Sequence, residues 1–267
     1  GPLLLLLVLL MGVGPLLPWR KASVKNAVKA LRLPAGVGLV TGVALAISGI
    51  GQPVALAAYA ICAFVVAGIV HEWVRGIRSR NRKGEIYPAA FGRLLVANRP
   101  RYGGYIVHLG IMMLAIGAIA SSFYGVQRDF AMSVGDEASL GDYSFRYLGV
   151  DRFNYTDRQE EVVRLEVRSG DKYLGGMEPF RAYFPAFKIA ATRGAIRSTP
   201  IEDFYVVPSE IQDDGQAVFR VLINPLVWWM WASGPVMLLG VVLGLSPQRL
   251  PAPAKLRVPA YTRMAGT

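Results

Sequence analysis

Residues 101–122, RYGGYIVHLGIMMLAIGAIASS, form an apolar run of membrane length that contains His108, one of only two histidines in the chain. About 20 mostly apolar residues in a helix cross the hydrocarbon core of a bilayer. The run therefore predicts a transmembrane helix. An ionisable side chain inside a bilayer is costly and rare, so His108 is a candidate functional residue whose partner has to be found.

Four further apolar runs predict additional helices, at residues 3–17, 35–50, 54–74 and 222–245. The chain is 53% hydrophobic and only 18% charged, with a mean hydropathy of +0.37, which is unusual for a wholly soluble domain. The first run is short for a bilayer span and lacks an initiator Met or a charged flank. We expect the chain to begin inside a transmembrane helix and to be a fragment, because the features of a signal peptide are missing.

The net charge of +11 is concentrated beside the apolar runs. Lys and Arg number 5 in residues 18–34, 8 in 75–101 and 4 in 248–267. Short basic loops next to membrane spans indicate the cytoplasmic side. Five spans of alternating orientation place all three basic segments on that side, and this distribution disfavours a nucleic-acid partner.

Residues 125–221 have a different pattern, since apolar and polar residues alternate at 130–134, 143–150, 162–168 and 217–223. Alternation with period two, bounded by Gly-Asp and Asp-Gly turns, is typical of strands. The sequence thus predicts a polytopic α-helical membrane protein with one extracytoplasmic β-rich domain. We expect four transmembrane helices in 1–124, the β-rich domain in 125–221 with an exposed loop at 151–161, the last helix in 222–247 and a cytoplasmic tail in 248–267.

The surroundings of His108 fit two readings. Gly104 and Ala115 share its helix face, and Gly110 and Gly117 lie nearby, so either a neighbouring helix or a flat ring has room to approach. The first reading is a packing seam with His108 hydrogen-bonded across it; the second is an axial ligand of haem iron, with the glycines giving clearance to the ring. His71, at the inner end of the third span, is a weaker candidate for a second ligand and reads better as part of an interfacial cap.

The single cysteine, Cys62, lies in an apolar run and reads as a buried packing residue. It excludes an internal disulfide and a CxxC metal site. No CxxCH is present, so the chain is not itself a c-type cytochrome.

Several segments together resemble the C-terminal half of the CcmF family, the membrane haem lyases of System I cytochrome c maturation. They are MGVGPLLPWRKAS, NRPRYGGYIVHLGIMMLAIGAIASSFYG, RDFAMSVGDEASLGDYSFRYLGV and NPLVWWMWASGPVMLLGVVLGLSP. The resemblance implies a haem b in the membrane held by two histidines, of which His108 matches the C-terminal one. The other ligand and the tryptophan-rich haem-handling segment belong to the family's N-terminal half. Trp228, Trp229 and Trp231 lack the pattern of that segment and are read as an outer-interface belt.

The resemblance also implies a partner set and a location. The partners are the missing N-terminal half, a CcmE-type haem chaperone, a CcmH-type thiol reductant, apocytochrome c, membrane lipid and a reductant such as quinol. Electrons are expected to pass to the substrate haem during thioether attachment. The expected location is the bacterial inner membrane, with the β-rich domain on the periplasmic side, and the fragment alone is expected to be inactive. The competing hypothesis is a non-catalytic membrane scaffold or transporter subunit whose β domain binds a partner.

Overall fold

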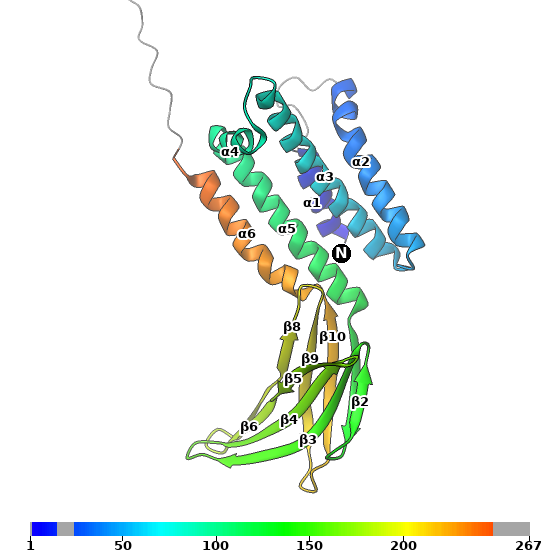
Figure 1. The fold of residues 1–267 in the computed structure, drawn as a ribbon, viewed down its shortest axis with the longest axis vertical. Coiled ribbons are helices and arrows are strands. Elements are labelled where there is room, and N and C mark those ends of the chain that lie inside the picture. Colours follow the sequence, from blue (N-terminus) through cyan, green and yellow to red (C-terminus); the bar gives the residue numbers. More distant parts are fainter. Residues whose placement is uncertain (1, 15–23, 248–267) are drawn as a thin grey trace, which may run out of the picture.

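The computed structural model describes residues 2–14 and 24–247, which form a helical unit and a β domain at one end of it (Figure 1). The predicted tail at 248–267 and the basic residues Arg20 and Lys21 lie outside these ranges. The helices are α1 (Pro2–Val13), α2 (Val24–Ile47), α3 (Pro53–Asn81), α4 (Tyr87–Ala97), α5 (Arg99–Tyr124) and α6 (Val227–Leu245).

Four helices in the described part of the chain are long and apolar enough to cross a membrane: α2, α3, α5 and α6. The described residues of α1 form a helix of 12 residues, shorter than a span. The chain is thus a multi-pass helical membrane protein with a β-rich domain. The five predicted spans correspond to these four helices and α1.

The predicted basic loops are partly helical. Lys25, Lys29 and Arg32 belong to the first turns of α2, and the segment 75–101 contains the end of α3 and all of α4. Lys and Arg are good helix formers, and their long side chains reach water from a helix end near the interface. A basic stretch in the sequence therefore does not show where a helix ends.

Ten strands form the β domain as two sheets. The four-stranded sheet has the order β1-β10-β9-β8, and the other has the order β2-β3-β4-β6-β7 with β5 paired to β4. Their interior is aromatic and aliphatic, with Phe145, Tyr147, Phe204 and Phe219 fully buried. The bounds are β1 (Val126–Met132), β2 (Glu137–Leu140), β3 (Tyr143–Asn154), β4 (Gln159–Ser169), β5 (Lys172–Met177), β6 (Phe180–Phe184), β7 (Ile189–Arg193), β8 (Ala195–Ser198), β9 (Glu202–Ile211) and β10 (Ala217–Pro225).

Two boundaries predicted from the sequence are wrong: the loop at 151–161 and the start of the last helix at 222. The expected exposed loop at 151–161 is mostly strand, because β3 and β4 stay paired out to Asn154 and Gln159. Its charged residues pair across the strands, as in the 3.1 Å ion pair between Arg152 and Glu161, so a polar sequence here is compatible with a ladder. Residues 222–226 do not belong to the last helix: β10 continues to Pro225, and Leu226 has a left-handed φ of 57°.

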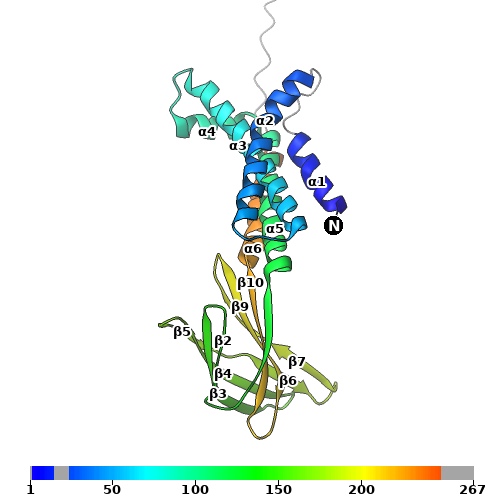
Figure 2. The ribbon, with the colours of Figure 1, turned by 90° about the vertical axis from the view of Figure 1, so that its right-hand side faces the viewer.

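The helical unit and the β domain are joined by two nearly direct connections (Figures 1 and 2). Only Gly125 separates α5 from β1, and only Leu226 separates β10 from α6. Strands β1 and β10 pair with each other along their length, starting at Val126 and Ile223. Arg220 on β10 also donates hydrogen bonds to Asp129 on β1 at 3.1 and 3.3 Å, and this contact lowers the pKa of the Asp129 carboxyl.

Helices α5 and α6 pack against each other through glycines. A β-carbon added at Gly103 would lie 2.5 Å from the carbonyl oxygen of Gly240, and one added at Gly117 would lie 2.8 Å from that of Leu226. Gly110, between them, meets Met237 and the backbone of Ser233 in the same way. Small residues at intervals of seven thus let the two backbones touch, as in other closely packed membrane helices.

We expect Gly103→Val to weaken the α5–α6 contact by about 1–3 kcal/mol, because the added carbons have no space between the two backbones. Gly104→Ala is the matched control, since no atom lies within 4 Å of a β-carbon at that position. Unfolding of the purified protein in mild detergent by added SDS, followed by circular dichroism, gives the comparison. Equal stability of the two variants would contradict the close packing.

Candidate functional site

His108 lies on the side of α5 that faces away from α6. Seven residues make nearly two helical turns, so His108 points within about 20° of Arg101 and about 160° from the Gly103–Gly110–Gly117 line. Arg101 reaches toward α3, where its Nη2 lies 2.6 Å from Oε2 of Glu72. The imidazole of His108 is therefore on the flank of α5 turned toward α3.

The Nδ1 atom of His108 is buried and has no hydrogen-bond partner among the described residues. The packing hypothesis placed His108 on the helix–helix seam with a hydrogen bond across it. The glycine seam with α6 lies on the opposite side of α5 from His108. A buried polar nitrogen without a partner is unusual and calls for a ligand or another group to satisfy it.

The glycines near His108 have different roles from the one expected. Gly110 and Gly117 contact α6 and give no clearance on the histidine side. Gly104, one turn before His108 and on the same side, is the open position, because a β-carbon there would meet nothing within 4 Å. Clearance for a flat group beside His108 thus rests on Gly104.

The part of α3 level with His108 is apolar. The two helices run in opposite directions, and Arg101 on α5 contacts Glu72 on α3. His108 follows Arg101 by seven residues, so it lies level with the residue seven before Glu72, which is Val65. Val65 and Ile69 are buried in a cluster that also contains Met112 of α5. At this depth α3 offers no second nitrogen or carboxylate ligand.

His71 is not brought toward His108. It lies about 100° round α3 from Glu72, the residue that points at α5, and about two turns farther from the β domain than His108. Its Nδ1 is also buried without a partner. No group of three or more His, Cys, Asp or Glu side chains suited to a metal ion occurs in the described residues.

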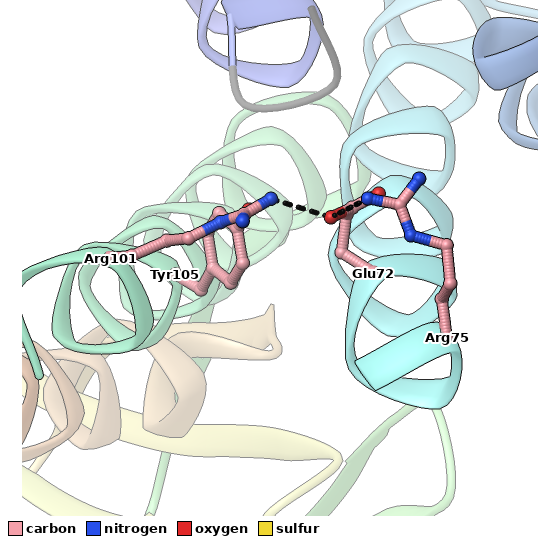
Figure 3. Close-up of polar contacts among 4 residues, drawn as sticks. All are labelled: Glu72, Arg75, Arg101 and Tyr105. Atoms are coloured by element: carbon pink, nitrogen blue, oxygen red, sulfur yellow. Dashed lines mark hydrogen bonds and ion pairs between the residues drawn. The ribbon is translucent and has the colours of Figure 1, made fainter. Parts of the chain in front are cut away.

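Glu72 is the centre of a charged cluster toward the ends of α3 and α5 that lie away from the β domain (Figure 3). Its side chain is only 6% exposed, and its Oε2 accepts hydrogen bonds from Arg101 at 2.6 Å and from Arg75 at 2.9 Å. The Nε of Arg101 also donates to the hydroxyl of Tyr105 at 2.8 Å, and its guanidinium lies over that ring. The cluster holds α5 against α3 at Arg101, about two helical turns before His108.

The amino-acid sequence contains a partial signal for this cluster. Glu72 is the one acid within the third apolar run, and Arg101 opens the next one. A buried carboxylate in a membrane helix needs a cation. The choice between Arg101 and its other basic neighbours depends on how α3 and α5 dock, and the pattern of residues does not carry that information.

Comparison with known proteins gives one consistent result. The family model described as "CcmF C-terminal beta-sandwich" matches residues 123–225. The chain is 30% identical over 168 residues to the cytochrome c-type biogenesis protein CcmF of Pseudomonas aeruginosa, covering 63% of this chain and 26% of that protein. It is 27% identical over 262 residues to the cytochrome c-type biogenesis protein ccl1 of Rhodobacter capsulatus, covering 96% of this chain and 38% of the relative.

A solved structure titled "Cytochrome c Heme Lyase CcmF" has the same fold. It superposes with a TM-score of 0.71 at 23% identity, over 92% of this chain and 39% of that one. The chain therefore spans about two fifths or less of the proteins it matches.

We expect Glu72→Gln to destabilise the helical unit by about 1–3 kcal/mol, because the amide cannot neutralise the two guanidinium groups that share its oxygen. Arg75→Gln is the matched control. The side chain of Arg75 is 63% exposed, and the loss of a largely exposed ion pair costs about 0–1 kcal/mol. SDS-induced unfolding in mild detergent measures both variants, and a larger loss for Arg75→Gln would refute the central place of Glu72.

Proposed function

Because the chain belongs to the CcmF family of cytochrome c-type biogenesis proteins, we propose that it forms part of a membrane haem lyase and that His108 is an axial ligand of a haem b. The observation that carries the proposal is the pair formed by His108 and Gly104. The Nδ1 atom of His108 is buried without a hydrogen-bond partner among the described residues, and Gly104 leaves the helix surface one turn away open.

The residues around His108 fit a haem in chemistry and in setting. Imidazole is the usual axial ligand of electron-transfer haems, and an apolar surrounding helps to set their potential. Val65, Ile69 and Met112 belong to a buried apolar cluster at this level of the bundle. This cluster would exclude water from the side of the site that lies between α3 and α5. The four membrane-length helices of the described chain would place this site within the bilayer.

A bound haem b would supply a one-electron carrier inside the bilayer, and the chain's own residues would hold it in place. His108 would bind the iron through a ring nitrogen. Gly104 would allow the ring to approach the α5 backbone. Glu72 and Arg101 would fix the rotation of α5 and, through it, the direction of the imidazole.

The second axial ligand is proposed to come from a part of the protein outside this chain. The described stretch of α3 level with His108 is apolar, and His71 lies about two turns away from that level, which supports a ligand from elsewhere. Since the chain spans only about two fifths of its relatives, the fragment alone would hold haem loosely and would not catalyse attachment.

The proposed setting is the inner membrane of a bacterium, with the β domain on the periplasmic side. The basic residues of α4 and of the ends of α3 and α5 lie at the opposite end of the helices from the β domain (Figure 1), which supports this orientation through the positive-inside rule. Electrons from a membrane reductant such as quinol would reach the substrate haem. A CcmE-type chaperone would deliver that haem, and a CcmH-type reductant would keep the thiols of apocytochrome c free.

In the complete protein, with the family's N-terminal half present, we expect His108→Ala to abolish the reduced α-band of haem b, because one axial nitrogen is lost. His71→Ala is the matched control and should keep the band, since His71 lies about two helical turns from the level of His108. Reduced-minus-oxidised spectra and the pyridine haemochrome assay measure both variants. An unchanged α-band in His108→Ala would remove the ligand role.

The same spectra separate the alternative function. A non-catalytic scaffold or transporter subunit would give a colourless protein, and its behaviour would not depend on His108. Gly104→Leu adds an independent test within the haem hypothesis. It should lower the haem content by filling the open surface while leaving the α5–α6 seam, and hence the SDS unfolding profile, unchanged.

A further inference from the structure

The turn between β8 and β9, residues 199–201, is attached to the start of α6. The backbone N–H of Leu226 donates to the carbonyl of Ile201 at 2.8 Å. The indole Nε1 of Trp229 donates to the carbonyl of Pro200 at 2.9 Å. This tip of the β domain is thus held beside the first turn of a membrane-spanning helix (Figure 1).

The depth of the turn follows from the α5–α6 packing. The carbonyl of Leu226 contacts α5 at Gly117, whereas α5 continues as an apolar helix to Tyr124. Seven more residues extend α5 by about 10 Å at 1.5 Å per residue. The turn therefore lies level with the last apolar turns of α5, inside the outer end of that span.

The outward surface of the turn is apolar. Ile201 is 72% exposed, and Trp231 on the neighbouring helix is 78% exposed. Residues 198–201, Ser-Thr-Pro-Ile, contain no charged side chain. Two large exposed apolar side chains at the level of a membrane-spanning helix match an interfacial position, where tryptophan is also favoured.

Each backbone N–H group of the turn has a hydrogen-bond partner, which favours a position in contact with lipid. The N–H groups of Ile201 and Glu202 both donate to Oγ1 of Thr199, at 3.3 and 3.0 Å. The N–H of Thr199 donates to the carbonyl of Glu202 at 3.0 Å. Proline has no N–H to satisfy, and the carbonyls of Pro200 and Ile201 accept the bonds from α6.

We propose that the β8–β9 turn inserts into the outer membrane–water interface, with Ile201 and Trp231 in contact with phospholipid at the boundary of headgroups and acyl chains. The occupant is lipid because the turn is hydrogen-bonded to the first turn of the membrane-length helix α6 and lies level with the last apolar turns of α5. The insertion gives the β domain a third attachment to the membrane, beside α5–β1 and β10–α6, and so limits its tilt.

Site-directed spin labelling of the full chain in lipid bilayers tests this insertion. Cys62 is the single cysteine and is buried, so a Cys62→Ala background allows one label at a time. Single labels are introduced by Ile201→Cys in the turn and by Ile196→Cys on β8, farther from the helices. Phe187→Cys is the matched control. Phe187 is 73% exposed, as Ile201 is, but it precedes β7 in the membrane-distal part of the domain (Figure 2).

Power saturation with oxygen and with a water-soluble nickel chelate reports the depth of each label. We expect the ratio of oxygen to nickel accessibility to be several-fold higher at residue 201 than at residue 187, with residue 196 between them. Equal ratios at 201 and 187 would place the turn in water and overturn the proposal. Low accessibility of residue 201 to both reagents would also overturn it, because a protein surface would then cover the turn.

Discussion

The contact between α5 and α6 is the interaction on which the arrangement of the molecule depends. The two helices touch backbone to backbone at Gly103, Gly110 and Gly117. The same two segments then continue outward as β1 and β10, which are hydrogen-bonded to each other. One antiparallel pair therefore runs through both halves of the structure, first as helices and then as strands, with a single residue at each change.

This continuity relates His108 to the β domain. The histidine stands on α5, whose rotation is fixed by α6 on one side and by the Glu72–Arg101 contact on the other. Because only Gly125 separates α5 from β1, a change in the pairing of β1 with β10 would displace α5 directly. The faces of α5 also differ: the glycine line packs against α6, while a β-carbon at Gly104, on the side of His108, would meet no other atom within 4 Å.

Sequence reasoning recovered the features that depend on local composition. Apolar runs gave the spans at α2, α3, α5 and α6, and period-two alternation gave β1, β3, β4 and β10. It missed strands such as β7, whose five residues are all exposed, because alternation only appears where one face is buried. It also took residues 151–161 for a loop, since cross-strand ion pairs let a highly charged stretch remain in the ladder.

The candidate site shows the same division. His108 was found because a histidine is conspicuous in an apolar run, whereas the distinct roles of the neighbouring glycines were not. Gly103 and Gly104 are adjacent in sequence and identical in type, yet one touches Gly240 and the other touches nothing. Helix periodicity places them 100° apart, but which face meets α6 is decided by packing partners more than a hundred residues away.

The unequal lengths of α5 and α6 explain why tryptophans and the β8–β9 turn gather at one level. Helix α5 has 26 residues and α6 has 19, a difference of about 10 Å at 1.5 Å per residue. The helices are level at the end away from the β domain, where Gly103 meets Gly240 and Gly244, so the whole difference falls at the end next to the β domain. There the last residues of β10 run beside α5 in place of helix. Strand backbone near lipid needs its polar groups paired, and β1, β9 and the bond from Leu226 to Ile201 meet that need.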